Sequence, residues 1–279
     1  MRRTGIVLAI AALVAVFSPA AAAQAVTGWT TVGSDNARPL DEGQGLATIE
    51  RPSGTVYRYT GITTVPVNLS SQGWNHVGDP GSARGWYVEP YQRDDRGAKL
   101  FRVESPDGTW ANYTHTLESW EANNNSFAAV TPDARWMVAG EWGTMDRLLV
   151  HPMPGVAHTN PSANLPYSAA IRLDRPVRDI QGCDFVTATR LLCSSDDPEG
   201  SLFGTTKPLL QVDLSGALSG SDVTGRVTSL GQLPLKSTCS GNFETEGIDV
   251  AADGTLRVVV LSPSWCVAFD SKTWRFRKS

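Results

Sequence analysis

The stretch Glu246-Gly247-Ile248-Asp249-Val250, followed by Asp253-Gly254 and then by Leu256-Arg257-Val258-Val259-Val260-Leu261, decides the fold of this chain. Two short apolar runs around an Asp-Gly pair predict a strand, a tight turn and a second strand. Weaker copies precede it, at residues 76–79 with 86–88, 127–130 with 135–138, and 181–185 with 190–193. Their turns centre near residues 84, 134, 188 and 253, so the spacings are 50, 54 and 65 residues. Periods of this size are typical of propeller blades.

A second series of short apolar strands follows the hairpins. Third strands are expected at residues 55–59, 99–103, 147–150, 208–213 and 266–270, and fourth strands at 65–67, 113–116, 168–172, 225–228 and 274–276. No stretch of twelve or more residues shows helical periodicity, because Pro, Gly, Asn and Ser interrupt each one. We therefore predict an all-β β-propeller of five blades with four antiparallel strands each, with six blades as the alternative. Residues 28–32 are expected to complete the last blade and close the ring.

The first residues have the pattern of a secretory signal peptide. Arg2-Arg3 precedes an apolar run from Gly5 to Phe17, and Ala20-Ala21-Ala22-Ala23 supplies small residues for cleavage. We expect residues 1–23 to be the signal and residues 24–279 to form a single secreted, extracytoplasmic propeller domain. The arginine pair also fits twin-arginine export, and the sequence does not separate the two routes. No other segment is apolar enough to span a bilayer, so we expect no integral membrane contact.

The charge balance argues against nucleic acid as a partner. The chain has 24 Lys and Arg against 28 Asp and Glu, and loss of Arg2 and Arg3 leaves 22 against 28, a net charge of −6. Basic residues gather only at Arg275-Phe276-Arg277-Lys278, too few to neutralise a phosphate backbone. We expect a monomer whose partner is a small molecule, a glycan or an extracellular protein.

Four cysteines in an oxidising compartment favour two disulfides, for which three pairings exist. Cys183 and Cys193 flank the turn at Ala188 symmetrically, so in an antiparallel hairpin they face each other. This predicts Cys183 bonded to Cys193 and leaves Cys239 for Cys266. Four free buried thiols are the alternative, and the spacings do not suit zinc.

The innermost strand of each blade lines the central channel of a propeller, so polar residues of different blades should meet there. The candidates for one channel mouth are His76, Asn125, Gln181 and Glu246, with Asp79, Asp184 and Asp249 three residues further along their strands. Carboxylates and amides gathered in this way could hold Ca²⁺, with Glu246 and Asp249 as its ligands. The alternative is that these groups cap strands and hold channel water.

Nine tryptophans are available for stacking on a ligand. Trp120 and Trp142 each stand next to a glutamate, Glu121 and Glu141, and are expected near a channel mouth as a platform for a sugar. The other candidates, Trp86, Trp136 and Trp265, are expected to pack between blades.

The segments Glu246-Gly247-Ile248-Asp249 and Asp253-Gly254-Thr255-Leu256 resemble blades of the phytase-like, gluconolactonase-like and related secreted propellers. In the gluconolactonase-like family the resemblance implies a divalent ion in the channel with a glutamate ligand, here Glu246. The chain as a whole is similar to exported propeller proteins of high-GC bacteria.

Two functions from different classes fit these observations. The first, which we favour, is an extracellular module that binds a ligand or a protein without converting it, because no complete catalytic set is visible. The second is a metal-dependent hydrolase or lactonase with its site at the central channel. Carboxylate pairs for glycoside cleavage are available among Glu118, Glu121, Glu141, Asp184, Glu244 and Glu246. The sequence does not decide between binding and catalysis.

Overall fold

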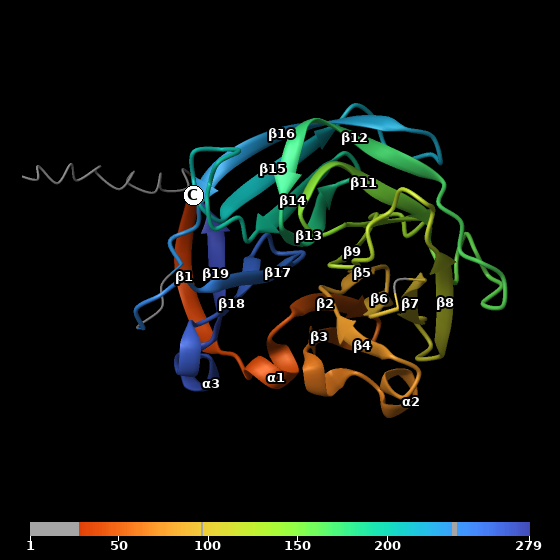
Figure 1. Ribbon diagram of the computed structural model, residues 1–279, viewed down its shortest axis with the longest axis horizontal. Coiled ribbons are helices and arrows are strands. Elements are labelled where there is room, and N and C mark those ends of the chain that lie inside the picture. Colours follow the sequence, from red (N-terminus) through yellow and green to blue (C-terminus); the bar gives the residue numbers. More distant parts are fainter. Residues whose placement is uncertain (1–27, 96, 236–238) are drawn as a thin grey trace, which may run out of the picture.

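The computed structural model describes residues 28–95, 97–235 and 239–279, so the expected signal peptide at 1–23 lies outside the described residues. The fold is all-β, and Figure 1 shows its sheets arranged around a central axis, which is the architecture of a β-propeller. The helices are single turns in connections: α1 (Pro39–Glu42), η1 (Ile62–Thr64), α2 (Val67–Ser70), η2 (Ser264–Cys266) and α3 (Val267–Asp270). No helix in the described part of the chain is long and apolar enough to cross a membrane.

The first two sheets come from the N-terminal part of the chain. One is a hairpin of two strands, β2 (Gly45–Arg51) and β3 (Gly54–Thr60). The other has the order β4 (Trp74–Val77), β6 (Trp86–Arg93), β7 (Ala98–Glu104) and β8 (Trp110–Thr116), with β5 (Gly81–Ala83) also paired to β6.

An eight-stranded sheet follows, which consists of two antiparallel units of four strands. The first unit has the strands β9 (Ala128–Val130), β10 (Trp136–Ala139), β11 (Thr144–Pro152) and β12 (Ala169–Arg178). The second has β13 (Ile180–Thr187), β14 (Arg190–Ser195), β15 (Pro208–Leu214) and β16 (Val223–Gln232). Their outer strands, β12 and β16, pair in parallel at residues 171–173 and 223–225.

The last sheet joins the two ends of the described chain. Its order is β17 (Glu244–Val250), β18 (Leu256–Leu261), β19 (Lys272–Lys278) and β1 (Trp29–Asn36). Antiparallel pairing of β1 with β19 confirms the prediction that the segment beginning at residue 28 completes the last sheet. The N-terminal strand therefore closes the ring by hydrogen bonds.

Three sequence expectations about individual segments are wrong. Residues 65–67 form no strand, because Pro66 directly precedes α2, and the first sheet keeps two strands. Residues 266–270 turn through η2 and α3, so residues 274–276 lie in the third strand of the last sheet and β1 is the fourth. Trp265 lies on η2 and is 74% exposed instead of packed between sheets, whereas Trp86 and Trp136 pack against buried clusters as expected.

The innermost strands contact one another in a ring, in the order β2, β17, β13, β9 and β5. The Asp79 side chain is 1% exposed at the centre of this ring, where its Oδ1 accepts a hydrogen bond from the Leu46 amide and its Oδ2 from the Ile248 amide, at 3.0 and 3.2 Å. A Cβ at Gly45, Gly182 or Gly247 would lie 2.0–2.3 Å from an Asp79 oxygen. The glycines on the inner strands therefore make room for a central carboxyl group, and the channel is closed at mid-height.

Buried apolar clusters join most neighbouring sheets. One packs the two halves of the eight-stranded sheet together, and another packs the second half against the last sheet. Among the described residues, no such cluster joins the β2–β3 hairpin to the last sheet. Polar contacts replace it: Thr48 donates its amide to Asp249 Oδ1 at 2.6 Å and its hydroxyl to Oδ2 at 2.9 Å, and Arg257 pairs with the same carboxylate at 2.7 Å.

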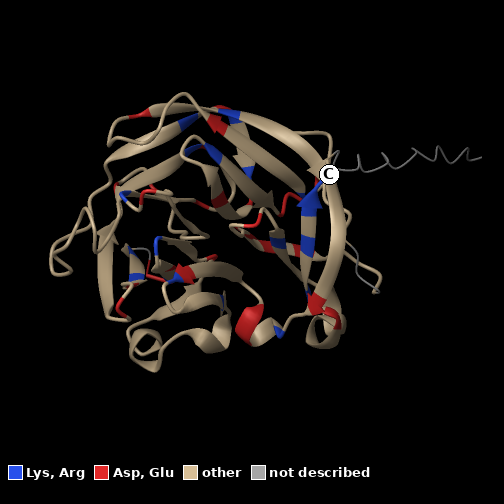
Figure 2. Cartoon of the chain, turned by 180° about the vertical axis from the view of Figure 1, so that it is seen from behind, with Lys and Arg blue, Asp and Glu red and all other residues tan. Residues whose placement is uncertain are grey.

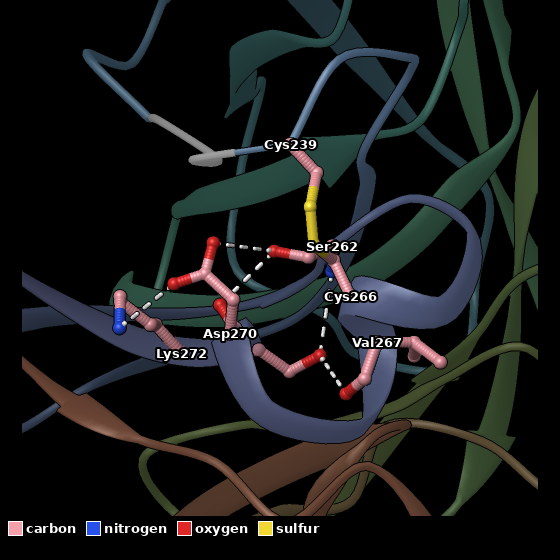
Figure 3. The surroundings of a disulfide bond; sticks show 7 residues. Cys239, Ser262, Cys266, Val267, Asp270 and Lys272 are labelled. Atoms are coloured by element: carbon pink, nitrogen blue, oxygen red, sulfur yellow. Dashed lines mark hydrogen bonds and ion pairs between the residues drawn. A yellow bond between two sulfur atoms is a disulfide. The ribbon is translucent and has the colours of Figure 1, made fainter.

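Both predicted disulfides are confirmed. Cys183 and Cys193 are directly opposed on β13 and β14, with Cα atoms 4.0 Å apart. Cys239 and Cys266 are bonded with Cα atoms 6.3 Å apart. Figure 3 shows that the second bond ties the segment before β17 to the end of η2, where α3 begins. The end of α3 is held in turn, because Ser262 Oγ donates to the Asp270 carbonyl at 3.0 Å. Two disulfides are typical of proteins from an oxidising compartment.

Candidate functional site: the channel mouth

The central ring has a cavity on each side of Asp79. We call the first the mouth pocket: it has a volume of about 290 Å³ and is lined by Gln44, His76, Gln92, Asn124, Ser126, Trp142, Gln181, Glu244 and Glu246. The second, the basal cavity, has a volume of about 180 Å³. Its lining includes Thr48 on β2, Asp184 on β13 and Asp249 on β17. On each of these strands, the residues that contact Asp79 lie between those that line the mouth pocket and those that line the basal cavity.

Strand geometry explains how distant segments meet in the mouth pocket. Gln181 and Glu246 stand near the beginnings of inner strands β13 and β17, and Gln44 directly precedes inner strand β2. The register of β17 shifts between Thr245 and Ile248, and the Gly247 amide within this bulge donates to the Gln44 carbonyl at 3.2 Å. Such bulges re-aim side chains, and here the bulge brings Glu246 into the pocket beside β2.

Glu246 is the most unusual group of the pocket. Glu246 is only 3% exposed, and no hydrogen bond or ion pair joins its carboxylate to another described residue. Burial raises the pKa of this carboxyl well above its ordinary value, and the carboxylates of Glu244 and Asp196 raise it further, against the smaller opposing effect of Lys207. Lys207 is itself paired with Asp196. An unpaired buried carboxyl is costly, so this group is available for a ligand.

Two further polar atoms that line the pocket have no hydrogen-bond partner among the described residues. Asn124 Oδ1 and Ser126 Oγ are buried without a hydrogen bond. Burial lowers the pKa of His76, so its imidazole is neutral at physiological pH. Asn125, which the sequence placed at the mouth, turns away from it: its Nδ2 donates to the carbonyls of Tyr91 and Leu100 at 3.1 and 3.3 Å.

The expected aspartates do not join this pocket. Burial raises the pKa of Asp184 well above its ordinary value and the nearby Asp249 carboxylate adds to the effect, while the amides of Val250 and Phe185 oppose it. Asp249 is held by Thr48 and Arg257. Both carboxyl groups therefore serve the contacts between inner strands on the basal side.

The sequence named Glu246 and Asp249 as ligands of one calcium ion. The two residues line different cavities, separated by Asp79. Within residues 28–95, 97–235 and 239–279, no group of three or more His, Cys, Asp or Glu side chains is arranged to hold a metal ion. Glu246 and Asp249 therefore share no cavity in which they could bind one ion together.

Trp120, Glu141 and Trp142 lie together in a neighbouring groove, which we call the tryptophan cleft. It has a volume of about 590 Å³ and is lined by Trp120, Ala122, Glu141, Trp142, Thr144, Met145, Asp146, Arg147 and Pro176. The two indoles are 45% and 44% exposed. Trp142 lines both this cleft and the mouth pocket, so the two hollows are adjacent.

Sequence reasoning missed Gln44, Gln92, Asn124 and Ser126 as lining residues. Gln92 lies on a second strand, β6, and not on an innermost one, while Gln44 belongs to the unit whose inner strand the pattern did not reveal. Asn124 and Ser126 could have been identified as lining residues, because they lie within four residues of the beginning of inner strand β9 at Ala128.

A buried polar cluster behind the tryptophan cleft was also missed. His115 Nε2 and Glu121 Oε2 are 2.8 Å apart, and the rings of His115 and His151 are 4.8 Å apart. Lys99 is fully buried, which lowers its pKa, and its Nζ has no hydrogen-bond partner. Burial also lowers the pKa of His151 to about 3. The cluster supports the segment that carries Trp120. Figure 2 shows that Lys, Arg, Asp and Glu are spread over several sheets.

Comparisons with known proteins identify no family. No protein-family model matches the chain, and no curated protein sequence matches it. Among solved structures, a glucose dehydrogenase aligns over 90% of this chain and 99% of its own length, with 9% identity and a TM-score of 0.43. A nidogen/laminin complex aligns over 77% and 72%, with 10% identity and a TM-score of 0.37. The β-propeller domain of the Trilobed protease from Pyrococcus furiosus, described as having an open velcro topology, aligns over 73% and 57%, with 6% identity and a TM-score of 0.30.

Proposed function

We propose that this protein is a secreted, extracytoplasmic binding module whose mouth pocket holds a small, hydroxyl-rich ligand of the sugar class. The observation that carries the proposal is the Glu246 carboxyl, which lines a polar cavity, is buried and has no partner among the described residues. In this proposal the protein acts as a monomer, and its sheets are five blades, of which the first keeps only β2 and β3.

The chemistry of the lining favours a sugar. The pocket offers carboxylate, amide, hydroxyl and imidazole groups from several segments, and among residues 28–95, 97–235 and 239–279 no Lys or Arg lines it. A ligand with many hydroxyl donors satisfies such acceptors, whereas an anionic ligand would meet Glu244 and Glu246 without a compensating cation. Trp142 adds an exposed ring at the rim, and aromatic side chains supply large contact area with a polar edge.

A second candidate function, hydrolysis at the mouth pocket, is favoured by the raised pKa of Glu246. A buried carboxyl with a raised pKa keeps its proton to a higher pH than an exposed one, which suits it to general-acid catalysis. Glu244 stands two residues away and lines the same pocket, so a second carboxylate is available. In this case sugars are cleaved and Glu246→Gln abolishes turnover.

The test is isothermal titration calorimetry of the mature chain against a panel of neutral monosaccharides, glucosamine and glucuronic acid. We expect a neutral sugar or glucosamine to bind, glucuronic acid to fail, and Glu246→Gln to weaken binding about tenfold or more, the value of a hydrogen bond to a charged group. The matched control is Glu199→Gln, because Glu199 is on the surface with a side chain that is 64% exposed.

Chromatography of each titration mixture with disaccharides separates the two functions. Unchanged disaccharides support binding alone, whereas release of monosaccharides that stops in the Glu246→Gln variant supports hydrolysis. Absence of binding for the whole panel, or equal binding by the wild type and the Glu246→Gln variant, contradicts a sugar site in the mouth pocket.

A further inference from the structure

We propose that the tryptophan cleft is a second sugar subsite, so that the ligand is a linear oligosaccharide that enters the mouth pocket with one end and lies across Trp142 toward Trp120. This inference rests on the proposed function and extends it. It names the class of ligand and the direction in which the oligosaccharide leaves the mouth pocket.

The first argument is that the two hollows share a wall. Trp142 lines the mouth pocket on one side and the tryptophan cleft on the other. No ring stacking or cation–π contact within the described chain occupies the Trp142 indole, which remains 44% exposed. A sugar in the pocket and a sugar in the cleft would therefore both be within reach of the same free indole.

The second argument is topological. The connection from β8, the outer strand of its sheet, to β9, an inner strand, lines both the tryptophan cleft and the mouth pocket. Trp120 lies in the outer part of this connection and lines the cleft, while Asn124 and Ser126 lie in its inner part and line the pocket. One continuous segment thus provides contacts along the whole proposed path.

The third argument is that Trp120 is held in place before any ligand arrives. The Arg147 guanidinium lies 4.5 Å from the Trp120 ring centroid, and its Nη2 donates to the Trp120 carbonyl at 3.2 Å. Tyr167 contacts the indole edge-to-face at 5.1 Å. Arg147 is in turn paired with the buried carboxylate of Glu141 at 3.1 Å. A fixed aromatic platform binds with little loss of side-chain freedom.

Polar groups accompany the platform. Arg147 Nε is buried without a hydrogen-bond partner, and the side chain of Asp146 is 75% exposed at the rim of the cleft. A donor and an acceptor beside two exposed indoles provide the mixture of stacking and hydrogen bonding that a sugar ring requires.

The experiment compares chain length. Titrations use glucose to cellopentaose, xylose to xylopentaose, and N-acetylglucosamine to chitopentaose. In at least one series we expect affinity to rise about fivefold or more between the monomer and the trimer, the value of one aromatic contact. Trp120→Ala and the cleft-filling variant Thr144→Tyr should remove this gain and leave monosaccharide affinity unchanged. Trp265→Ala is the matched control, since Trp265 is exposed and lines neither hollow.

The outcomes separate failure of the second subsite from failure of the mouth pocket. Equal affinity for monomers and oligomers in every series overturns the subsite and leaves the mouth pocket intact. An oligomer gain that persists in both cleft variants, with unchanged melting temperatures, also overturns it. Oligomer binding that depends on Trp120 but not on Glu246 instead overturns the proposed function of the mouth pocket. No binding in any series overturns both claims.

Discussion

Glu246 and Asp249 are three residues apart on β17, yet they line different cavities on opposite sides of the buried Asp79. The Glu246 carboxyl has no partner within the part of the chain that the structure describes, and the Asp249 carboxyl is held by Thr48 and Arg257. The same strand therefore carries a group available for a ligand and a group that joins the ends of the ring. Substitutions at the two positions should have opposite effects on stability.

Asp249→Asn should destabilise the protein by about 3–5 kcal/mol, because it leaves the guanidinium of Arg257 buried without its anion. The same change loosens the contact between the β2–β3 hairpin and the last sheet. Urea unfolding measures the effect. Asp253→Asn is the control, since the side chains of Asp253 and of its partner Arg277 are both more than half exposed and solvent screens such pairs. Equal losses in the two variants would contradict this role of Asp249.

Glu246→Gln should stabilise the ligand-free protein near neutral pH. The folded-state pKa of Glu246 is raised above its ordinary value of 4.5, so its contribution to stability is full below that value and is lost as the pH rises through the folded-state pKa. A neutral isostere removes this loss. We expect a gain of about 1–3 kcal/mol at pH 7.5 and no gain near pH 4.

Thermal unfolding at the two pH values checks this prediction, with Glu199→Gln unchanged at both. A lower melting temperature for Glu246→Gln at pH 7.5 would show that the carboxylate has a stabilising partner. If the prediction holds, weakened sugar binding by the same variant cannot result from unfolding.

Gly247→Ala should prevent folding or cost about 3 kcal/mol, because overpacking at such a site cannot relax. The added Cβ would lie 2.0 Å from Asp79 Oδ1 and 2.5 Å from the Gly45 Cα. Gly216→Ala is a matched control, since a Cβ there has no neighbour within 4 Å. The measurement is the yield and urea midpoint of each variant. A Gly247→Ala protein as stable as Gly216→Ala would rule out a tightly closed channel.

Removal of the Cys239–Cys266 bond by a double serine substitution should lower the free energy of unfolding by about 2–4 kcal/mol, since the bond restricts the unfolded chain. Urea unfolding of this variant against the wild type measures the loss. Peptide mapping without reduction should recover Cys183 with Cys193 and Cys239 with Cys266. Recovery of Cys183 with Cys239 would contradict the fold around β13 and β17.

The repeated hairpins were predictable because strands with alternating or continuous apolar residues and tight turns leave a local pattern. The hairpin of Cys183 and Cys193 is the clearest case, since symmetry about one turn gave both the register and the disulfide. The exceptions depend on tertiary context. Residues 266–270 are apolar enough for a strand, but the chain there turns through α3 before β19. No local sequence pattern in this segment predicts that turn.

The candidate site was only partly predictable. Inner strands were expected to bring His76, Gln181 and Glu246 to one place, and the structure puts all three on the mouth pocket. Which side chain faces the pocket depends on register and bulges, which the sequence pattern does not show. For this reason Asn125 was expected to line the mouth pocket, whereas its neighbours Asn124 and Ser126 do so. The closure of the channel by Asp79 depends on glycines from three strands, a coincidence in space that a linear pattern does not reveal.

The most direct test of the account is a crystal structure of the protein soaked with the tightest-binding sugar from the titrations. The account predicts electron density for a sugar in the mouth pocket, in contact with Trp142, Gln181 and Glu246. Density in the groove of about 760 Å³ lined by Tyr57, Arg257 and Arg275, with the mouth pocket empty, would contradict it.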